Sequence, residues 1–281
     1  MEENKEIINE EKNPESPKKQ KAFLRPSKPV ALIAYVVLLF FLGSGIMYII
    51  AGIISSTRGL DFNTLIKTLS DSNPSQFGTD YVSASYFVQG ISNFITYLIA
   101  FAVVVFYTRD LIVTDFKDLI NRRTKLGWMI PLMAVAFTGI AFLIDLFVSQ
   151  AVKSSNNQNT IVQILKTGSA PFMIICTVLF APVVEELVYR KCIFSMLKDR
   201  LGLVWCYILS TVLFALPHMI STPLVNGNVG IWLLQSLPYF LSGALLCLVY
   251  HLSKFNIYAT ITAHILNNVL AVFLVYGGFN A

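Results

Sequence analysis

The sequence predicts an all-α fold, a polytopic bundle of about seven membrane-spanning helices. The first observation is composition: 55% of the 281 residues are apolar and 13% are charged, whereas an average soluble domain has about 25% charged residues. The second is clustering, because the apolar residues form stretches of about 20 residues, the length that an α-helix needs to cross the hydrocarbon core of a bilayer. The net charge of +5 comes from basic residues scattered over several short loops. These features argue against a soluble enzyme, a disulfide scaffold and a nucleic-acid-binding protein.

The amino-terminal segment is polar, since residues 1–29 hold seven basic and six acidic side chains and no apolar run. We therefore expect a solvated tail rather than a cleavable signal peptide, followed by a helix bundle over residues 30–281. The four cysteines are 16, 14 and 41 residues apart, which fits neither a CxxC pair nor a zinc framework, so we expect reduced thiols that pack between helices. They are Cys176, Cys192, Cys206 and Cys247.

Seven windows are long and apolar enough to span a bilayer. They are 30–54, 83–107, 127–151, 169–190, 203–220, 231–252 and 258–276. The tail and the alternate connections hold 17 Lys and Arg residues on one side of the membrane and 4 on the other. Because positively charged loops stay in the cytoplasm, this asymmetry predicts a cytoplasmic amino terminus and an external carboxyl terminus. We expect an integral protein of a bacterial plasma membrane.

Three connections between the windows carry structure of their own. Segment 109–126 mixes apolar residues with charges, which predicts an amphipathic helix lying at the cytoplasmic interface. Segments 55–82 and 152–168 are predicted to be external loops with short helical pieces. The chain has no internal repeat.

A few ionisable residues interrupt the apolar windows. They are Asp145, Glu185, Glu186, Arg190, His218, His251 and His264. Because an ionisable side chain in a bilayer interior costs at least a few kcal/mol, each is a candidate functional residue. Asp145 belongs to no motif, and we expect it to be hydrogen-bonded or to face the bundle interior. We expect His251 to be an interface residue at a cytoplasmic helix end.

The fourth window ends in A-P-V-V-E-E-L-V-Y-R, residues 181–190. Glu186 and Arg190 are four residues apart, so they meet on one helix face as an ion pair. Glu185 points about 100° away from Glu186 and has no local partner. A carboxylate of this kind facing a cavity in the bundle is a candidate general base. The alternative is an interfacial charge cluster.

Two further windows carry polar side chains of the kinds that hydrolytic sites use. The sequence F-A-L-P-H ends at His218, and Pro217 disturbs the helix backbone just before it. The sequence H-I-L-N-N begins at His264 and places Asn268 on the same helix face. Taken alone, these are an interfacial histidine and a hydrogen-bonding contact between helices. Together with the paired carboxylates, they indicate a water-activating site.

These patterns resemble the motifs E-E-x-x-x-R, F-x-x-x-H and H-x-x-x-N of the CPBP intramembrane proteases. That family includes the type II CAAX prenyl endopeptidases and the Abi-type bacteriocin-processing and self-immunity proteins. The resemblance covers about residues 165–276. The matching residues are Glu185, Glu186 and Arg190, then Phe214 and His218, then His264 and Asn268.

The resemblance implies a division of roles. Glu185 would activate the attacking water, with His218 and His264 completing the site. The second Glu and the Arg of the first motif would form a supporting pair, and Asn268 would hold the tetrahedral intermediate, as a side-chain donor can. The reaction implied is hydrolysis of a peptide bond in a membrane-embedded or membrane-associated protein or peptide.

The sequence leaves a metal open. Glu185, His218 and His264 can make a three-ligand zinc site with an open fourth position, but the same groups can act without metal. The local zinc helix H-E-x-x-H is missing from the chain. Two other functions remain alternatives: a non-proteolytic bacteriocin self-immunity or scaffold protein, and a proton-coupled small transporter. A transporter predicts repeated halves, which the sequence does not have.

One geometric condition must be met for these residues to converge. His218 lies 16 residues beyond Gly202, about 24 Å along an ideal helix, whereas the fourth window ends soon after Glu185. We therefore expect the fourth helix to continue past Arg190 to about residue 200; the alternative is a fifth helix that starts deeper in the membrane.

Overall fold

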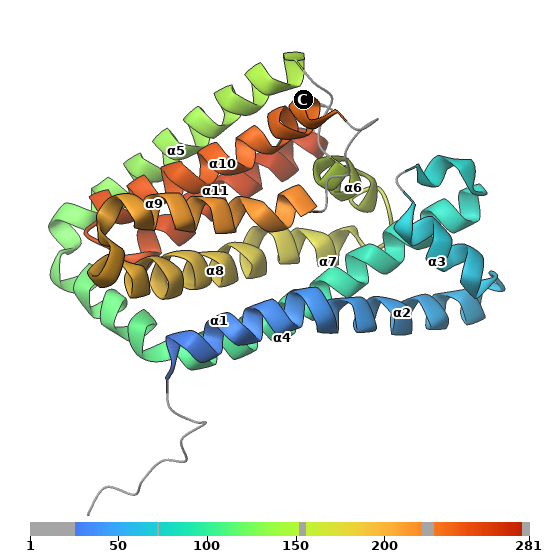
Figure 1. Cartoon of the computed structure of the whole chain (residues 1–281), viewed down its shortest axis with the longest axis horizontal. Coiled ribbons are helices and arrows are strands. Elements are labelled where there is room, and N and C mark those ends of the chain that lie inside the picture. Colours follow the sequence, from blue (N-terminus) through green and yellow to red (C-terminus); the bar gives the residue numbers. More distant parts are fainter. Residues whose placement is uncertain (1–25, 72, 152–155, 221–227, 277–281) are drawn as a thin grey trace, which may run out of the picture.

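The computed structural model describes residues 26–71, 73–151, 156–220 and 228–276, and Figure 1 shows their arrangement as an all-helical bundle. Seven helices are long and apolar enough to cross a membrane, which confirms the predicted fold class. They are Lys28–Arg58, Thr79–Asn121, Lys125–Val148, Ala170–Lys198, Arg200–Ile220, Val229–Leu252 and Ile257–Tyr276. Most of the predicted tail, residues 1–25, lies outside the described residues.

The labels used below follow the chain. The elements are α1 (Lys28–Val37), η2 (Leu38–Leu42), α2 (Gly43–Arg58), α3 (Phe62–Ser70), η3 (Pro74–Gln76), α4 (Thr79–Asn121), α5 (Arg123–Ala151), α6 (Asn156–Ile164), α7 (Ala170–Ile175), η4 (Cys176–Phe180), α8 (Ala181–Glu186), η5 (Leu187–Phe194), α9 (Ser195–Ile220), α10 (Val229–Leu252) and α11 (Ile257–Tyr276). The segments η2, η4 and η5 are π-helical turns within longer helices, and η3 is a short 3₁₀ turn.

The helix that carries Glu185 runs from Ala170 to Lys198 and so continues well past Arg190, as we expected. It ends near Gly202, whose φ of 76° interrupts α9. This left-handed backbone conformation is accessible to glycine without steric cost. The chain therefore reverses after residue 200 and returns as the helix that carries His218.

Segment 109–126 differs from the prediction, because it is not a separate interfacial helix. Its first part continues α4 without a break to Asn121, and its last residues begin α5 after Arg122. The segment has no glycine or proline to interrupt the helix. Leu119 packs against the main core, and Asp115 is buried, while Phe116 is 50% exposed. The charges therefore face both solvent and the neighbouring helices.

The two predicted external loops contain the expected short helices, α3 in the first and α6 in the second. Residues 152–155 of the second loop lie outside the described residues. Asp61 caps α3 by accepting a hydrogen bond of 2.7 Å from the Thr64 N–H. This bond holds the pKa of the Asp61 carboxyl below its usual range.

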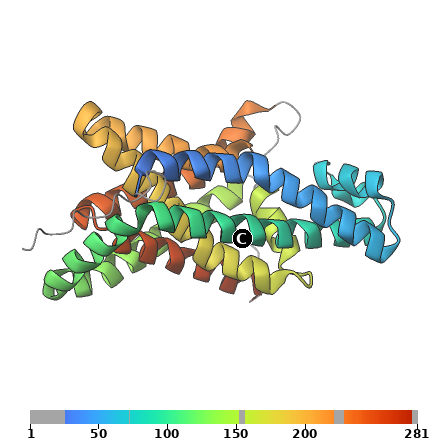
Figure 2. The same cartoon turned by 90° about the horizontal axis from the view of Figure 1, so that it is seen from below.

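The main hydrophobic core is shared by α1, α4, α5, the Ala170–Lys198 helix, α9, α10 and α11. Figures 1 and 2 both show α1 and α2 lying along α4. None of the four cysteines forms a disulfide, and all are buried, which agrees with their predicted packing role. Two environments were predicted for Asp145, a hydrogen bond or the bundle interior, and the second is wrong because Asp145 is exposed on α5. The reason is that α5 is a peripheral helix, packed mainly on α10 and α11.

Candidate active site

Glu186 and Arg190 form a fully buried ion pair, with 2.9 Å between Glu186 Oε1 and Arg190 Nη1. The ion pair predicted from the spacing of four residues is therefore present. Arg190 Nη2 donates a second hydrogen bond of 3.0 Å to the backbone carbonyl of Gly243 on α10. The guanidinium carbon lies 4.7 Å from the ring centroid of Phe214. Carboxylate, carbonyl and aromatic face together compensate a charge that has been removed from water.

His264 joins the two carboxylates of the doublet. Its Nδ1 lies 3.0 Å from Glu186 Oε1, and its Nε2 lies 3.9 Å from Glu185 Oε2. Because an ionised carboxylate only accepts, Nδ1–H is the donor to Glu186; in a neutral ring with this tautomer, Nε2 carries a lone pair toward Glu185. A separation of 3.9 Å is too long for a direct hydrogen bond, but one water molecule can contact both atoms.

Glu185 is nearly buried, with 5% of its surface exposed. Its Oε1 accepts a hydrogen bond of 2.9 Å from the Tyr97 hydroxyl of α4. Glu185 is therefore held from the first half of the chain as well as from the second. The hydroxyls of Tyr35 on α1 and Tyr189 on η5 form a separate pair, 3.0 Å apart.

The local backbone around the doublet is irregular. α8 is a six-residue α-helical piece between the π-helical turns η4 and η5. Pro182 lies in its first turn, and a proline ring lacks an N–H and crowds the preceding carbonyls. The widened turn η4 just before it relieves that conflict. Such π-turns within α-helices are frequent at functional sites.

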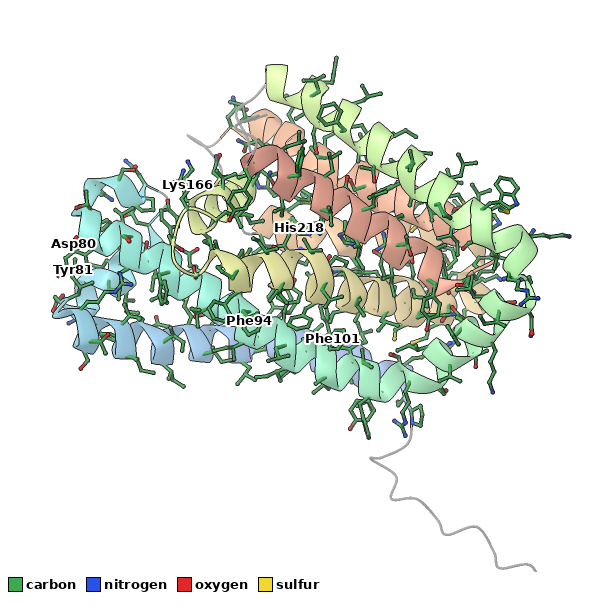
Figure 3. The ribbon with its side chains drawn as sticks, turned by 180° about the vertical axis from the view of Figure 1, so that it is seen from behind. Asp80, Tyr81, Phe94, Phe101, Lys166 and His218 are labelled. Atoms are coloured by element: carbon green, nitrogen blue, oxygen red, sulfur yellow. The ribbon has the colours of Figure 1, made fainter. Side chains whose placement is uncertain are left out.

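His218 reaches the same region from α9. Its ring stacks on Tyr239 of α10 with 4.3 Å between centroids and 4° between planes, and it lies 5.7 Å from the Phe214 ring. The His264 ring lies 5.8 Å from Phe214. Figure 3 shows His218 in the middle of the bundle. The two imidazoles therefore both contact Phe214.

Asn268 is on α11, one turn beyond His264. Asn268 Nδ2 donates a hydrogen bond of 2.8 Å to the backbone carbonyl of Thr177 in η4. One of its two amide hydrogens is therefore engaged with a neighbouring helix.

Part of the chain is similar to a known protein family. Residues 167–270 match the family described as type II CAAX prenyl endopeptidase Rce1-like. This part of the chain is an Rce1-like domain. The family resemblance carried by the three motifs is thereby confirmed. The Rce1-like domain contains every motif residue, whereas α1 to α6 lie outside the match.

One curated relative is also similar to part of the chain. The protein named "Putative membrane peptidase YdiL" from Bacillus subtilis (strain 168) is 25% identical to the chain over 136 residues. The match covers 46% of this chain and 54% of YdiL, so the chain spans about half the length of the curated relative it matches. No solved structure matches the chain.

The Rce1-like domain does not assemble the three-ligand metal set that its sequence allows. Within the described ranges, no three His, Cys, Asp or Glu side chains are grouped so that they could hold a metal ion. Glu185 and His264 are neighbours, but His218 is stacked on Tyr239. We therefore derive no step through a metal.

Sequence reasoning missed Tyr97. It belongs to none of the three motifs and lies in a window of apolar residues, 88 positions before Glu185. The one available signal was weak: a tyrosine deep in a predicted span must find a partner for its hydroxyl. His251, by contrast, lies where we expected, at the end of α10, where its Nδ1 is 3.1 Å from the Tyr207 hydroxyl.

Proposed function

We propose that this protein is an intramembrane endopeptidase that hydrolyses a peptide bond in a membrane-associated protein or peptide. The observation that carries the proposal is the buried pair of Glu185 Oε2 and His264 Nε2, 3.9 Å apart within the Rce1-like domain. A carboxylate and an imidazole at that separation suit a shared water molecule. The name of the family and that of YdiL point to peptidase chemistry.

The mechanism begins with a water molecule hydrogen-bonded to both groups. Glu185 takes a proton from the water molecule as the oxygen of that water attacks the scissile carbonyl carbon. The same proton is then delivered to the amide nitrogen as the C–N bond breaks, so that Glu185 returns to its starting state. His264 positions the water and is itself oriented by Glu186, whose charge is balanced by Arg190.

Two further residues would act on the developing oxyanion. Asn268 has a second amide hydrogen beyond the one bonded to Thr177, and a donor of this kind stabilises a tetrahedral intermediate. His218 lies one turn after Phe214 on α9, with 5.7 Å between the two ring centroids. We assign it to the same oxyanion or to the substrate carbonyl.

The test uses the full chain in liposomes and an internally quenched, farnesylated CAAX peptide, with the same peptide lacking the farnesyl group beside it. Glu185→Gln is expected to reduce the cleavage rate by about 100-fold or more, because it removes the proton acceptor. The control is Asp80→Asn, an exposed carboxylate at the start of α4, which should cleave like the wild type. Equal rates for wild type and Glu185→Gln would refute the mechanism.

Two other arms separate the alternatives. Cleavage of both peptides indicates an endopeptidase that does not read the lipid, and cleavage of neither by the wild type favours a non-proteolytic immunity or scaffold role. The zinc content of the active protein and its response to 1,10-phenanthroline decide metal dependence. Full activity without stoichiometric zinc supports the mechanism above, and loss of activity that added zinc restores contradicts it.

A further inference from the structure

Tyr97 lies outside the Rce1-like domain, yet it contacts the residue on which the proposed chemistry depends. Its hydroxyl donates to Glu185 Oε1 at 2.9 Å, across 88 residues of sequence. The other oxygen, Oε2, lies toward His264 Nε2. The two oxygens of one carboxylate therefore have separate partners, one from α4 and one from α11.

The height of Tyr97 along the bundle is fixed by two aromatic residues on the same face of α4. Phe94, three residues before it, packs on Phe172 with 5.2 Å between ring centroids and on Phe180 with 5.7 Å. Phe101, four residues after it, packs on Phe180 with 5.1 Å. Figure 3 shows Phe94 and Phe101 directed from α4 toward the helix that carries Glu185.

These contacts restrict the sliding and rotation of α4 against the helix that carries Glu185. Aromatic pairs at this separation contribute beyond the area they bury, and residues three and four apart share one helix face. Tyr97 lies between the two rings in sequence and on the same face. The packing of this helix face therefore fixes the position of the Tyr97 hydroxyl relative to the Glu185 carboxylate.

We propose that Tyr97 is a positioning residue, whose hydroxyl fixes the Glu185 carboxylate with Oε2 turned toward the water shared with His264. Without this bond, the carboxylate is free to rotate, because no other hydrogen bond to Oε1 is present among the described residues. A carboxylate that rotates presents Oε2 to the water for only part of the time. The inference rests on the proposed function and adds that the amino-terminal helices complete the site.

Tyr35 supplies a matched control. It also loses one hydroxyl on substitution by Phe, and its partner Tyr189 lies on the helix that carries Glu185, although Tyr35 is buried and Tyr97 is only partly buried. Its hydroxyl, however, pairs with Tyr189 and not with Glu185. A loss that is merely structural should therefore appear in Tyr35→Phe as well as in Tyr97→Phe.

The first measurement needs no substrate. The infrared difference spectrum between a protein and its Glu185→Gln counterpart isolates the vibration of the Glu185 carboxyl group. We expect Tyr97→Phe to shift this band relative to the wild type, because a hydrogen bond to Oε1 is lost, and we expect Tyr35→Phe to leave it in place. A band unchanged by Tyr97→Phe, or moved equally by both variants, overturns the inference.

The second measurement is cleavage of the farnesylated CAAX peptide. Tyr97→Phe is expected to lower kcat by about 10- to 100-fold, the usual cost of a misplaced reacting group, with KM within about twofold of the wild type. Tyr35→Phe should retain both constants. A wild type that leaves the peptide intact counts against the proposed function, while the infrared result still decides whether Tyr97 holds Glu185. A wild type that cleaves, with normal kcat in Tyr97→Phe, overturns the positioning role alone.

Discussion

At the scale of single residues, Glu186 is shared by two partners. Its Oε1 accepts from Arg190 Nη1 at 2.9 Å and from His264 Nδ1 at 3.0 Å. Glu186 has no exposed surface, and neither has Arg190. An unpaired charge in the protein interior is costly, so the buried Glu186 carboxylate is stable only while its donors are present. Arg190 therefore matters to folding as well as to the orientation of His264.

Arg190→Ala is expected to destabilise the protein by about 3 kcal/mol or more, because it leaves Glu186 short of its counter-charge. Arg190→Lys should restore only part of that loss, since a lysine has no planar fork to reach both Glu186 and the Gly243 carbonyl. The measurement is the unfolding midpoint in detergent, with the exposed Arg200→Ala as control. A fully active Arg190→Ala protein with an unchanged midpoint would contradict the pairing.

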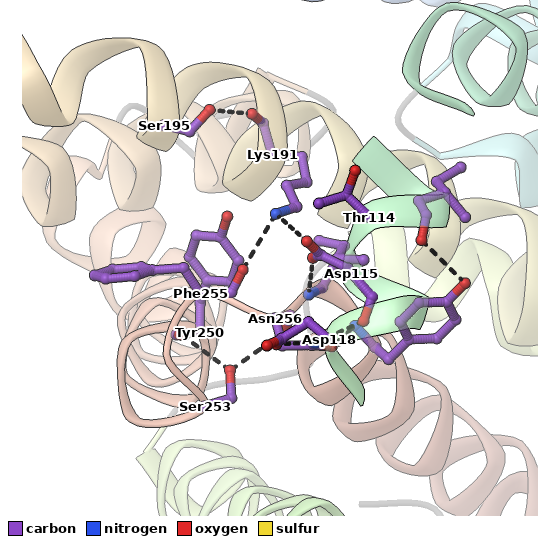
Figure 4. A network of polar contacts seen from close by, with 12 residues as sticks. Thr114, Asp115, Asp118, Lys191, Ser195, Tyr250, Ser253, Phe255 and Asn256 are labelled. Carbon is purple, nitrogen blue, oxygen red and sulfur yellow. Dashed lines mark hydrogen bonds and ion pairs between the residues drawn. The ribbon is translucent and has the colours of Figure 1, made fainter. Parts of the chain in front are cut away.

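At the scale of elements, a polar network joins neighbouring ends of three helices, as Figure 4 shows. Asp115 of α4 accepts from Lys191 Nζ at 2.7 Å and from the Ile257 N–H at 2.7 Å. Asn256 donates 2.9 Å to the Asp115 carbonyl and 3.0 Å to Asp118 Oδ2. The helices held together are those that carry Tyr97, Glu185 and His264, so the network fixes the framework of the site.

Asp115 also lies at the amino terminus of α11, where an anion is favoured by the free N–H groups and the helix dipole. The turn before that helix is unusual, since Lys254 and Phe255 both have positive φ values, 61° and 64°. Lys191 donates to the carbonyl of Phe255 in this turn at 3.2 Å. The network thus stabilises a backbone conformation that non-glycine residues rarely adopt.

Asp115→Ala is expected to destabilise the chain by about 3 kcal/mol, since it leaves the nearly buried Lys191 without its carboxylate. The control is Asp110→Ala, which removes an exposed carboxylate from the same helix and should change stability by less than about 0.5 kcal/mol. Thermal unfolding of both purified proteins gives the comparison. Equal midpoints would show that the network contributes little.

At the scale of the whole molecule, the seven candidate spanning helices of the described residues predict that the first and the last of them begin and end on opposite sides of the membrane. The charge asymmetry of the loops predicts that the amino terminus is cytoplasmic. With this orientation, the Asp115 network lies at the cytoplasmic face, and the turn between α3 and α4 lies outside. All four native thiols are buried, so introduced cysteines can report on the orientation.

Ser75→Cys, in the exposed turn η3, is expected to react with a membrane-impermeant maleimide in intact cells. Asn121→Cys, at the exposed end of α4, should react only after permeabilisation. The wild type supplies the background. Labelling of Asn121→Cys but not Ser75→Cys in intact cells would mean that the predicted orientation is reversed.

The parts predictable from sequence are those governed by short-range patterns. Window length identified the seven spanning helices, spacing of four identified the contact of Glu186 with Arg190, and distance along a helix identified the continuation to residue 200. Predictions failed where the deciding partner is remote. The pattern of segment 109–126 indicates an interfacial helix, because nothing in the sequence pairs Asp115 with Lys191, 76 residues away. The interior position predicted for Asp145 is wrong because no local sequence pattern tells which helix lies at the periphery of the bundle.

The anchoring of Glu185 by a phenol from α4 bears on protein engineering. A graft of residues 167–270 into a foreign membrane scaffold would transplant both carboxylates, both imidazoles and the asparagine. It would leave behind the Tyr97 hydroxyl, which donates a hydrogen bond to Glu185. The foreign scaffold would have to supply an equivalent hydrogen-bond donor at the same depth in the membrane. Without it, the carboxylate of Glu185 would rotate between orientations.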